Sequence, residues 1–243
     1  MNRTEPQSYQ DFETLPARVA GVVRSPRALF RTVIARPTWA GMMALTFAVS
    51  LGCGVAFMLT NVGRQALVDQ LERTALAFGR DVDETQYAQF RDVSRNGVTY
   101  AAVRALVSGP VLACGAAAVI FGLFTTLGGG EATYRQALAV TVHAGVILAV
   151  RQVVAMPVNY ARETLSSPAT LTMVVPMLDE ASPAARFFGA IDLFVVWWLV
   201  VLALGVALLY RRPVGATAAA FVGAYVGFAV LLAIAMVLSG GTV

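Results

Sequence analysis

The most regular feature of the chain is a series of long apolar stretches, separated by segments in which arginine and acidic residues gather. An α-helix needs about 20 apolar residues to cross a hydrocarbon core about 30 Å thick. Five stretches reach that length, and they cover residues 39–61, 98–126, 137–156, 187–210 and 215–238. The pattern predicts an all-α fold, a polytopic integral membrane bundle of five transmembrane helices.

The composition is also that of a membrane protein. Hydrophobic residues make up 58% of the chain, charged residues make up 13%, and the mean hydropathy is +0.69. A water-soluble domain would have to hide all five apolar stretches. The length suits one bundle, so we expect a flexible cytoplasmic N-terminus over residues 1–14 and a single membrane domain over residues 15–238.

The charges predict an orientation, because short cytoplasmic loops collect arginine and lysine. The segments before the first span, between the second and third, and between the fourth and fifth hold nine arginines and four acidic residues. The loops on the opposite side hold seven arginines and nine acidic residues. We therefore expect the N-terminus in the cytoplasm and the C-terminus outside, in agreement with an odd number of spans.

A short basic helix is predicted before the first span. Ser25 and Pro26 have the form of an N-cap followed by a proline at the first helical position. The apolar side of this amphipathic helix consists of Leu29, Phe30, Val33 and Ile34. The basic residues in and around it are Arg24, Arg27, Arg31 and Arg36. We expect the apolar side chains in the acyl boundary and the arginines against anionic headgroups, either as a juxtamembrane anchor or as a surface for a cytoplasmic partner.

Two short motifs resemble a known family. The first is a basic helix followed by Arg-Pro and Trp at the start of a span, written here as Ser25-Pro26-Arg27-Ala28-Leu29-Phe30 and Arg36-Pro37-Thr38-Trp39. The second is the glycine-rich turn with a Tyr-Arg-Gln helix start over residues 128–138. Both motifs are similar to the Ypt-interacting-protein (Yip) domain family, particularly its bacterial members. The resemblance covers most of residues 15–238.

The resemblance implies a non-enzymatic membrane protein with five spans and no catalytic residues to carry over. Eukaryotic relatives are linked to small GTPases of vesicle traffic and to membrane shaping, but this chain lacks their long N-terminal cytosolic domain. For bacterial members, the family implies a location in the inner (plasma) membrane and association with envelope transport machinery.

The glycine-rich turn also has two physical interpretations. Thr133 and Gln136 have the spacing of a capping box, which would satisfy free backbone donors at the start of the third span. Alternatively, the three glycines before them could cradle an anion beside the helix start. The turn lacks the Lys-Ser/Thr of a phosphate-binding P-loop, so we favour the capping box.

Charged residues within the spans are candidates for function, since they are costly at membrane depth. At about 1.5 Å per residue, Arg151 lies about 22 Å from the cytoplasmic side of the core, and Asp192 lies about 8 Å below the outer side. The two depths coincide, which predicts an ion pair between neighbouring helices. Arg104 lies at nearly the same level, and Gln152 stands beside Arg151 in the sequence.

Three interpretations of this polar cluster stay open. The first and preferred one is a structural clamp that satisfies buried charge. The second is a site, open to the outside, that binds an anionic headgroup or solute through Arg104 and Arg151. In the third, both arginines extend to the outer headgroups.

Two further features of the spans and two loops give local predictions. His143, the only histidine, is expected to be a packed residue hydrogen-bonded across helices, because one imidazole cannot form a metal site alone. Gly223 and Gly227 form a GxxxG motif, for which intramolecular packing is preferred over dimerisation. Between the spans, residues 62–97 read as helical and residues 157–186 as irregular.

The sequence predicts a binding protein without catalytic residues, cofactor or metal site. We expect an accessory or scaffold protein that contacts anionic headgroups of the bilayer and other membrane proteins but no nucleic acid, and a homo-oligomer stays open. The alternative is a small permease or a subunit of an exporter that uses the outer polar cluster. A broken helix or an inverted repeat would favour transport.

Overall fold

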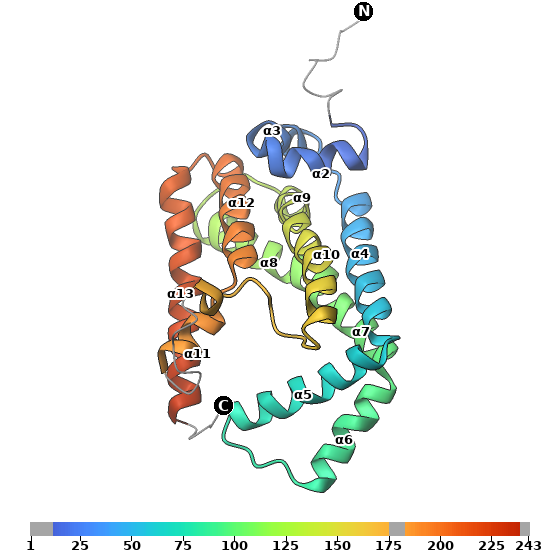
Figure 1. The fold of residues 1–243 in the computed structure, drawn as a ribbon. Coiled ribbons are helices and arrows are strands. Elements are labelled where there is room, and N and C mark those ends of the chain that lie inside the picture. The colour runs from blue at the N-terminus through green and yellow to red at the C-terminus, as the bar shows by residue number, and fades with distance from the viewer. Residues whose placement is uncertain (1–11, 175–182, 239–243) are drawn as a thin grey trace, which may run out of the picture. The chain divides into compact units, whose positions relative to one another are not determined.

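The computed structural model of the chain describes residues 12–174 and 183–238 (Figure 1). Within these residues the elements are helical, with no β-strand beyond one isolated bridge. The all-α class is therefore confirmed. Of the N-terminus expected to be flexible, residues 1–11 lie outside the described residues, and a helix, α2 (Leu15–Arg24), begins directly after residue 14.

Four helices are long and apolar enough to cross a membrane. They are α4 (Ala40–Met58), the continuous run Gly97–Leu127, the run Tyr134–Ala161 and α13 (Val214–Leu238). The fifth expected span contains α12 (Leu193–Leu209), which is strongly apolar but has only 17 residues. Four of the five expected spans are thus confirmed by length and composition.

The run Gly97–Leu127 is not a uniform α-helix. It consists of α7 (Gly97–Leu106), the π-helical segment η1 (Val107–Val111), α8 (Leu112–Phe121) and a second π-helical segment, η2 (Gly122–Leu127). Pro110 lies inside η1. Because proline lacks an N–H and clashes with the preceding turn, the wider π-helical turn lets the helix continue past it.

The chain divides into two compact units. The described residues of unit 1 are 12–48, 106–149 and 197–222. Those of unit 2 are 49–105, 150–174, 183–196 and 223–238.

The core of unit 1 surrounds α9 (Tyr134–Ala144), in which every residue from Ala137 to Ala144 is buried. The helix α3 (Pro26–Ala35) lies against α2 and α9 and buries Leu29, Phe30 and Val33. The Phe30 ring lies against Gly205 of α12, where an added Cβ would come within 2.5 Å of Val140. The expectation that the apolar side of α3 enters the acyl boundary is wrong for these three side chains, because the protein itself covers them.

Three segments predicted on the cytoplasmic side lie together in unit 1. Arg135 Nε donates to the Pro37 carbonyl at 2.9 Å, and Gln136 Nε2 donates to the Ile34 carbonyl at 3.1 Å. The Tyr210 hydroxyl, at the end of α12, is 3.0 Å from Thr125 Oγ1. These contacts join the end of α3, the glycine-rich turn and the α12–α13 turn at one end of the unit.

Unit 2 contains the predicted helices of the first long loop. They are α5 (Asn61–Ala77) and α6 (Glu84–Arg95), which pack against each other, and Gly79 follows α5 with a φ of +67°. The buried side of α5 joins a hydrophobic cluster that consists of Phe57, Met58, Ala66, Leu67 and Ala101. The prediction that residues 62–97 are helical is confirmed.

The second long loop is only partly irregular. The helix α10 (Val146–Ala161) continues four residues beyond Pro157, and the chain then forms turns up to the 3₁₀-helix η3 (Leu171–Val174). Residues 175–182 of this loop lie outside the described residues. The next element is α11 (Pro183–Ala190).

The fourth expected span is interrupted. Helix α11 ends at Ala190 and α12 begins at Leu193, so Asp192 does not lie five residues inside a continuous helix. Its carboxylate occupies the N-cap position of α12, for which aspartate is well suited. The prediction of one helix over residues 187–210 is therefore wrong.

Candidate functional site

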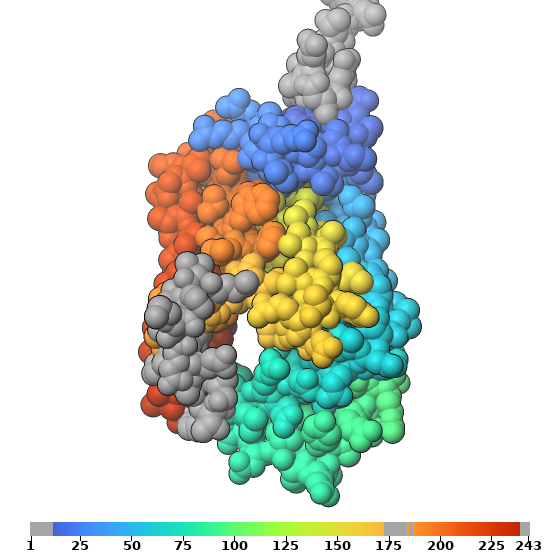
Figure 2. All heavy atoms as spheres, in the orientation of Figure 1, coloured from blue at the N-terminus to red at the C-terminus, as the bar shows by residue number. Residues whose placement is uncertain are grey.

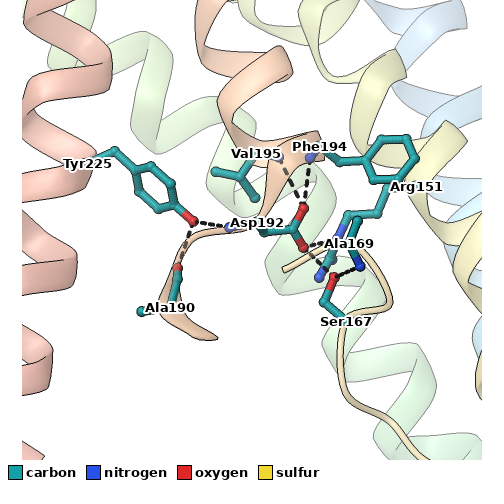
Figure 3. A network of polar contacts seen from close by, with 8 residues as sticks. All are labelled: Arg151, Ser167, Ala169, Ala190, Asp192, Phe194, Val195 and Tyr225. Atoms are coloured by element: carbon teal, nitrogen blue, oxygen red, sulfur yellow. Dashed lines mark hydrogen bonds and ion pairs between the residues drawn. The ribbon is translucent and has the colours of Figure 1, made fainter. Parts of the chain in front are cut away.

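Asp192 is the centre of a polar network in unit 2 (Figure 3). Its Oδ1 accepts hydrogen bonds from the backbone N–H of Phe194 at 2.8 Å and of Val195 at 3.4 Å. These N–H groups belong to the first turn of α12 and have no partner within the helix. The carboxylate therefore caps α12, and the positive end of the helix stabilises its charge.

The second carboxylate oxygen binds two side chains. Arg151 Nε of α10 donates to Asp192 Oδ2 at 2.7 Å, and Ser167 Oγ donates to the same oxygen at 2.5 Å. The ion pair expected from the matching depths is therefore present. The Asp192 side chain is 8% exposed and the Arg151 side chain 25% exposed, so the pair is largely shielded from solvent.

The backbone around the helix break is held by neighbouring segments. Tyr225 of α13 donates from its hydroxyl to the Ala190 carbonyl at 2.9 Å and accepts from the Asp192 N–H at 3.1 Å. On the other side, residues 169–171 pair with residues 191–193 through two backbone hydrogen bonds of 3.0 and 2.9 Å. Polar groups that a broken helix leaves without intrahelical partners are thus satisfied by tertiary contacts.

Both oxygens of the Asp192 carboxylate have partners. The carboxylate receives two backbone donors, one hydroxyl and one guanidinium, which is the set of partners that a buried ion pair needs to offset its desolvation. Arg151 contributes its Nε to this set. This geometry favours the structural clamp over a site in which Arg151 binds an anion.

The two other residues of the predicted cluster lie apart from the network. Arg104 of α7 is exposed and forms no hydrogen bond or ion pair with another described residue. Gln152 is half-buried and likewise makes no side-chain hydrogen bond within the described part of the chain. Equal depth in the membrane correctly predicted the contact between Arg151 and Asp192. It does not hold for Arg104 and Gln152, which do not contact the Asp192 carboxylate.

Arg104 instead lines a cavity of about 660 Å³ in unit 2. Its walls come from α5, α7, the segment after α10 and Gly189 of α11. Figure 2 shows this face hollowed between α5, in teal, and the end of α10 with the segment that follows, in yellow. Ser167 belongs both to the cavity wall and to the Asp192 network, so the two features share one side chain.

Sequence reasoning missed Ser167 and Tyr225. Ser167 stands in a loop that was expected to be irregular and offered no spacing signal. Tyr225 carried a usable signal, since a tyrosine hydroxyl within an apolar span needs a hydrogen-bond partner. It lies between Gly223 and Gly227 of the GxxxG motif, which is a signal for helix packing and not for a hydrogen bond.

The basic residues Arg24, Arg27, Arg31 and Arg36 are exposed on unit 1. Ser25 occupies the N-cap position before Pro26, as predicted, but its side chain makes no capping hydrogen bond. The helix is thus held by its buried apolar side, and its arginines point away from the core.

The capping box at the glycine-rich turn is confirmed. Thr133 Oγ1 accepts from the Gln136 N–H, and Gln136 Oε1 accepts from the Thr133 N–H at 2.9 Å. The N–H of Gly130 donates to the Phe124 carbonyl. The N–H groups of Gly130, Thr133 and Gln136 therefore already have partners and are not free to bind an anion.

Two predictions about the spans have different outcomes. His143 is fully buried in unit 1 and contacts the Ala139 carbonyl of its own helix at 2.7 Å through Nδ1. It is packed, but the expected hydrogen bond across helices is not seen among the described residues. Nothing described lies within 4 Å of a Cβ built on Gly223 or Gly227, so the close packing expected for the GxxxG motif is not seen among the described residues.

The part of the chain that the structure describes contains no group of three or more His, Cys, Asp or Glu side chains placed to hold a metal ion. Comparison with protein families gives one match, to the Yip1 domain, over residues 20–238. Searches of curated proteins and of solved structures found no match. The family match spans the basic helix, the Asp192 network and the cavity.

Proposed function

This chain belongs to the Yip1 domain family, and on that premise we propose that it is an accessory or scaffold protein that holds membrane partners or lipids. The family consists of membrane proteins and is not known for enzymes. The proposal places the protein in the inner membrane, with its N-terminus in the cytoplasm and its C-terminus outside.

The observation that carries the proposal is the basic end of unit 1. The described residues of the joined segments expose seven arginines, which are Arg24, Arg27, Arg31, Arg36, Arg135, Arg211 and Arg212. The acidic residues exposed in the same segments are Glu13 and Glu131. Because α3 buries Leu29, Phe30 and Val33 in the protein, the arginines of this surface lie on its exposed side.

Such a surface suits the anionic cytoplasmic leaflet. Each arginine close to an anionic membrane surface contributes about 1 kcal/mol of attraction. The excess of arginine at this end supports a cytoplasmic location for it. We infer that headgroups, or an acidic surface of another membrane protein, bind here.

The proposal includes a fifth span formed by α12. At about 1.5 Å per residue, its 17 residues extend about 26 Å, slightly less than a core about 30 Å thick. A bilayer adapts to a short span by local thinning at modest cost. With α12 across the membrane, the chain would have five spans and its termini on opposite sides.

The test is crosslinking in native membranes, followed by purification and mass spectrometry. We expect a membrane protein to be recovered in constant proportion with the chain, together with anionic lipid. Replacing Arg24, Arg27 and Arg31 together by Gln should remove both, whereas the matched replacement of Arg73, Arg80 and Arg91 in unit 2 should not. Equal recovery from the two triple variants would contradict the proposal.

A second candidate is a small permease or exporter subunit. The observation that favours it is the polar cavity of unit 2 beside an interrupted apolar segment, since broken helices line the binding sites of many transporters. If the wild-type chain were recovered without a protein partner but with a bound solute, this candidate would replace the first.

A further inference from the structure

The cavity of unit 2 has the size and position of a ligand site. Its volume of about 660 Å³ lies within the range of about 300–1,000 Å³ that small-molecule sites occupy. Its lining residues all belong to unit 2, and none of them belongs to the basic end of unit 1 on which the proposed function rests. Ligand binding in this cavity is therefore independent of the proposed function of the basic end.

The charge of the cavity lining is positive. Arg104 is the cationic side chain among the lining residues, and no carboxylate of the described residues lines the cavity. The acid of the adjoining network is Asp192, whose two oxygens accept hydrogen bonds from Arg151, Ser167 and the start of α12. The Arg104 charge is thus left without a counter-ion from the described protein.

Several hydroxyl protons remain available at the lining. Ser166 Oγ accepts from Thr164 at 3.1 Å, which leaves its own proton free to donate. Thr170 and Thr172 share one hydrogen bond of 2.7 Å, so one of these two hydroxyl protons is free. The Tyr100 hydroxyl donates to no described group. Together with Arg104, these groups form a lining rich in donors.

The wall that carries these hydroxyls is held in place by the clamp. Ser167 is bonded to Asp192, and residues 169–171 pair with the segment around the helix break. The segment from residue 165 to residue 172 is therefore attached to α10 and α12 rather than free to move away. A preformed set of donors lowers the cost of ordering a site on binding.

We propose that this cavity binds the phosphate group of an anionic ligand, with Arg104 as the charged contact and the lining hydroxyls as additional donors. Arginine suits phosphate because its planar guanidinium donates two parallel hydrogen bonds. The oxygens of a phosphate group accept further bonds from serine, threonine and tyrosine hydroxyls. The phosphate comes either from the headgroup of a membrane lipid or from a soluble phosphate ester.

The test is ligand titration of the full chain in detergent, read by native mass spectrometry and by thermal unfolding. The lipid probe is phosphatidylglycerol, with diacylglycerol as the control that lacks phosphate. The soluble probe is glycerol 3-phosphate, with glycerol as its control. Binding of phosphatidylglycerol alone identifies a lipid headgroup, and binding of both phosphate compounds identifies the phosphate group as sufficient.

Variants connect the binding to the cavity. Arg104→Gln should raise the dissociation constant at least tenfold, Arg104→Lys should raise it less, and Arg91→Gln on the exposed face of α6 should leave it unchanged. The triple glutamine variant of Arg24, Arg27 and Arg31 should also bind the phosphate probes as wild type does. The binding site and the proposed function can therefore fail independently of each other.

A cavity-filling variant distinguishes the site from an arginine that merely extends to surface headgroups. A Cβ on Gly189 meets only Thr172 Cγ2, at 3.8 Å, so Gly189→Leu should fold while its side chain fills the space. We expect it to abolish binding without lowering the unfolding temperature of the unliganded protein. Wild-type protein that binds neither phosphate probe, or Arg104→Gln and Gly189→Leu variants that bind as tightly as wild type, would overturn the proposal.

Discussion

The clamp at the start of α12 and the cavity beside it place two arginines of similar predicted depth in opposite situations. Arg151 is bonded to a carboxylate that is itself fully satisfied, whereas Arg104 faces a space lined by hydroxyl groups. The same residue type can therefore serve as a structural cation or as a ligand-binding one. What decides between the two is whether the protein supplies the counter-ion.

The largest expected effect comes from removing the carboxylate of the clamp. Asp192→Ala leaves Arg151 uncompensated and the first turn of α12 uncapped, and breaking a buried pair in this way costs about 3–5 kcal/mol. Asp192→Asn also removes the charge that compensates Arg151 but keeps a good N-cap, so its loss of stability should be about 1 kcal/mol smaller than that of Asp192→Ala. Thermal unfolding in detergent measures both. If Asp192→Ala had the stability of wild type, the clamp would not contribute to the fold.

Ser167→Ala should have the next largest effect and should affect both regions. The variant loses a hydrogen bond to a charged group, which is worth about 1.5–3 kcal/mol, and it loosens the wall that carries Ser166 and Thr170. We expect a lower unfolding temperature together with weaker binding of phosphatidylglycerol. A change in only one of these two readouts would show that the clamp and the cavity are independent.

Tyr225→Phe should have the smallest effect of the three. It removes one donor and one acceptor at the helix break but keeps the ring, so a loss of about 1–2 kcal/mol is expected. Tyr87→Phe, on an exposed helix of the same unit, is the matched control. If both variants unfolded alike, the hydrogen bonds that join α13 to residues 190–192 would be dispensable.

The elements that depend on local pattern were predictable from the sequence. Long apolar runs predicted four of the spans, and the capping box at Thr133 and Gln136 followed from its spacing. Counting residues along the spans also placed Arg151 and Asp192 at the same depth in the membrane, which predicted their ion pair correctly. Each of these results needs only helix geometry and the thickness of a bilayer.

The break before α12 was not predictable in this way. Residues 187–191 are largely apolar, so hydropathy continues through the point where the helix stops. The interruption is stable because Tyr225 and residues 169–171 satisfy the backbone, and these partners are distant in the sequence. No local sequence pattern predicts that these distant residues contact the helix break.

The direction in which side chains point was the other source of error. Depth along a helix says nothing of rotation about its axis, so Arg104 was grouped with Arg151 although it lines the cavity. Similarly, the apolar side of α3 was assigned to lipid, whereas Gly205 leaves room for Phe30 against α12. A glycine within a strongly apolar helix was the available sign that something large packs there.

The measurement that tests the central claim most directly compares Arg151→Gln with Arg104→Gln by thermal unfolding, with and without phosphatidylglycerol. We predict that Arg151→Gln is strongly destabilised without lipid, whereas Arg104→Gln unfolds within about 0.5 kcal/mol of wild type, as exposed substitutions usually do. Added lipid should stabilise the wild type but not Arg104→Gln. Equal destabilisation of the two variants, or equal stabilisation of wild type and Arg104→Gln by the lipid, would contradict the division into a clamp and a binding site.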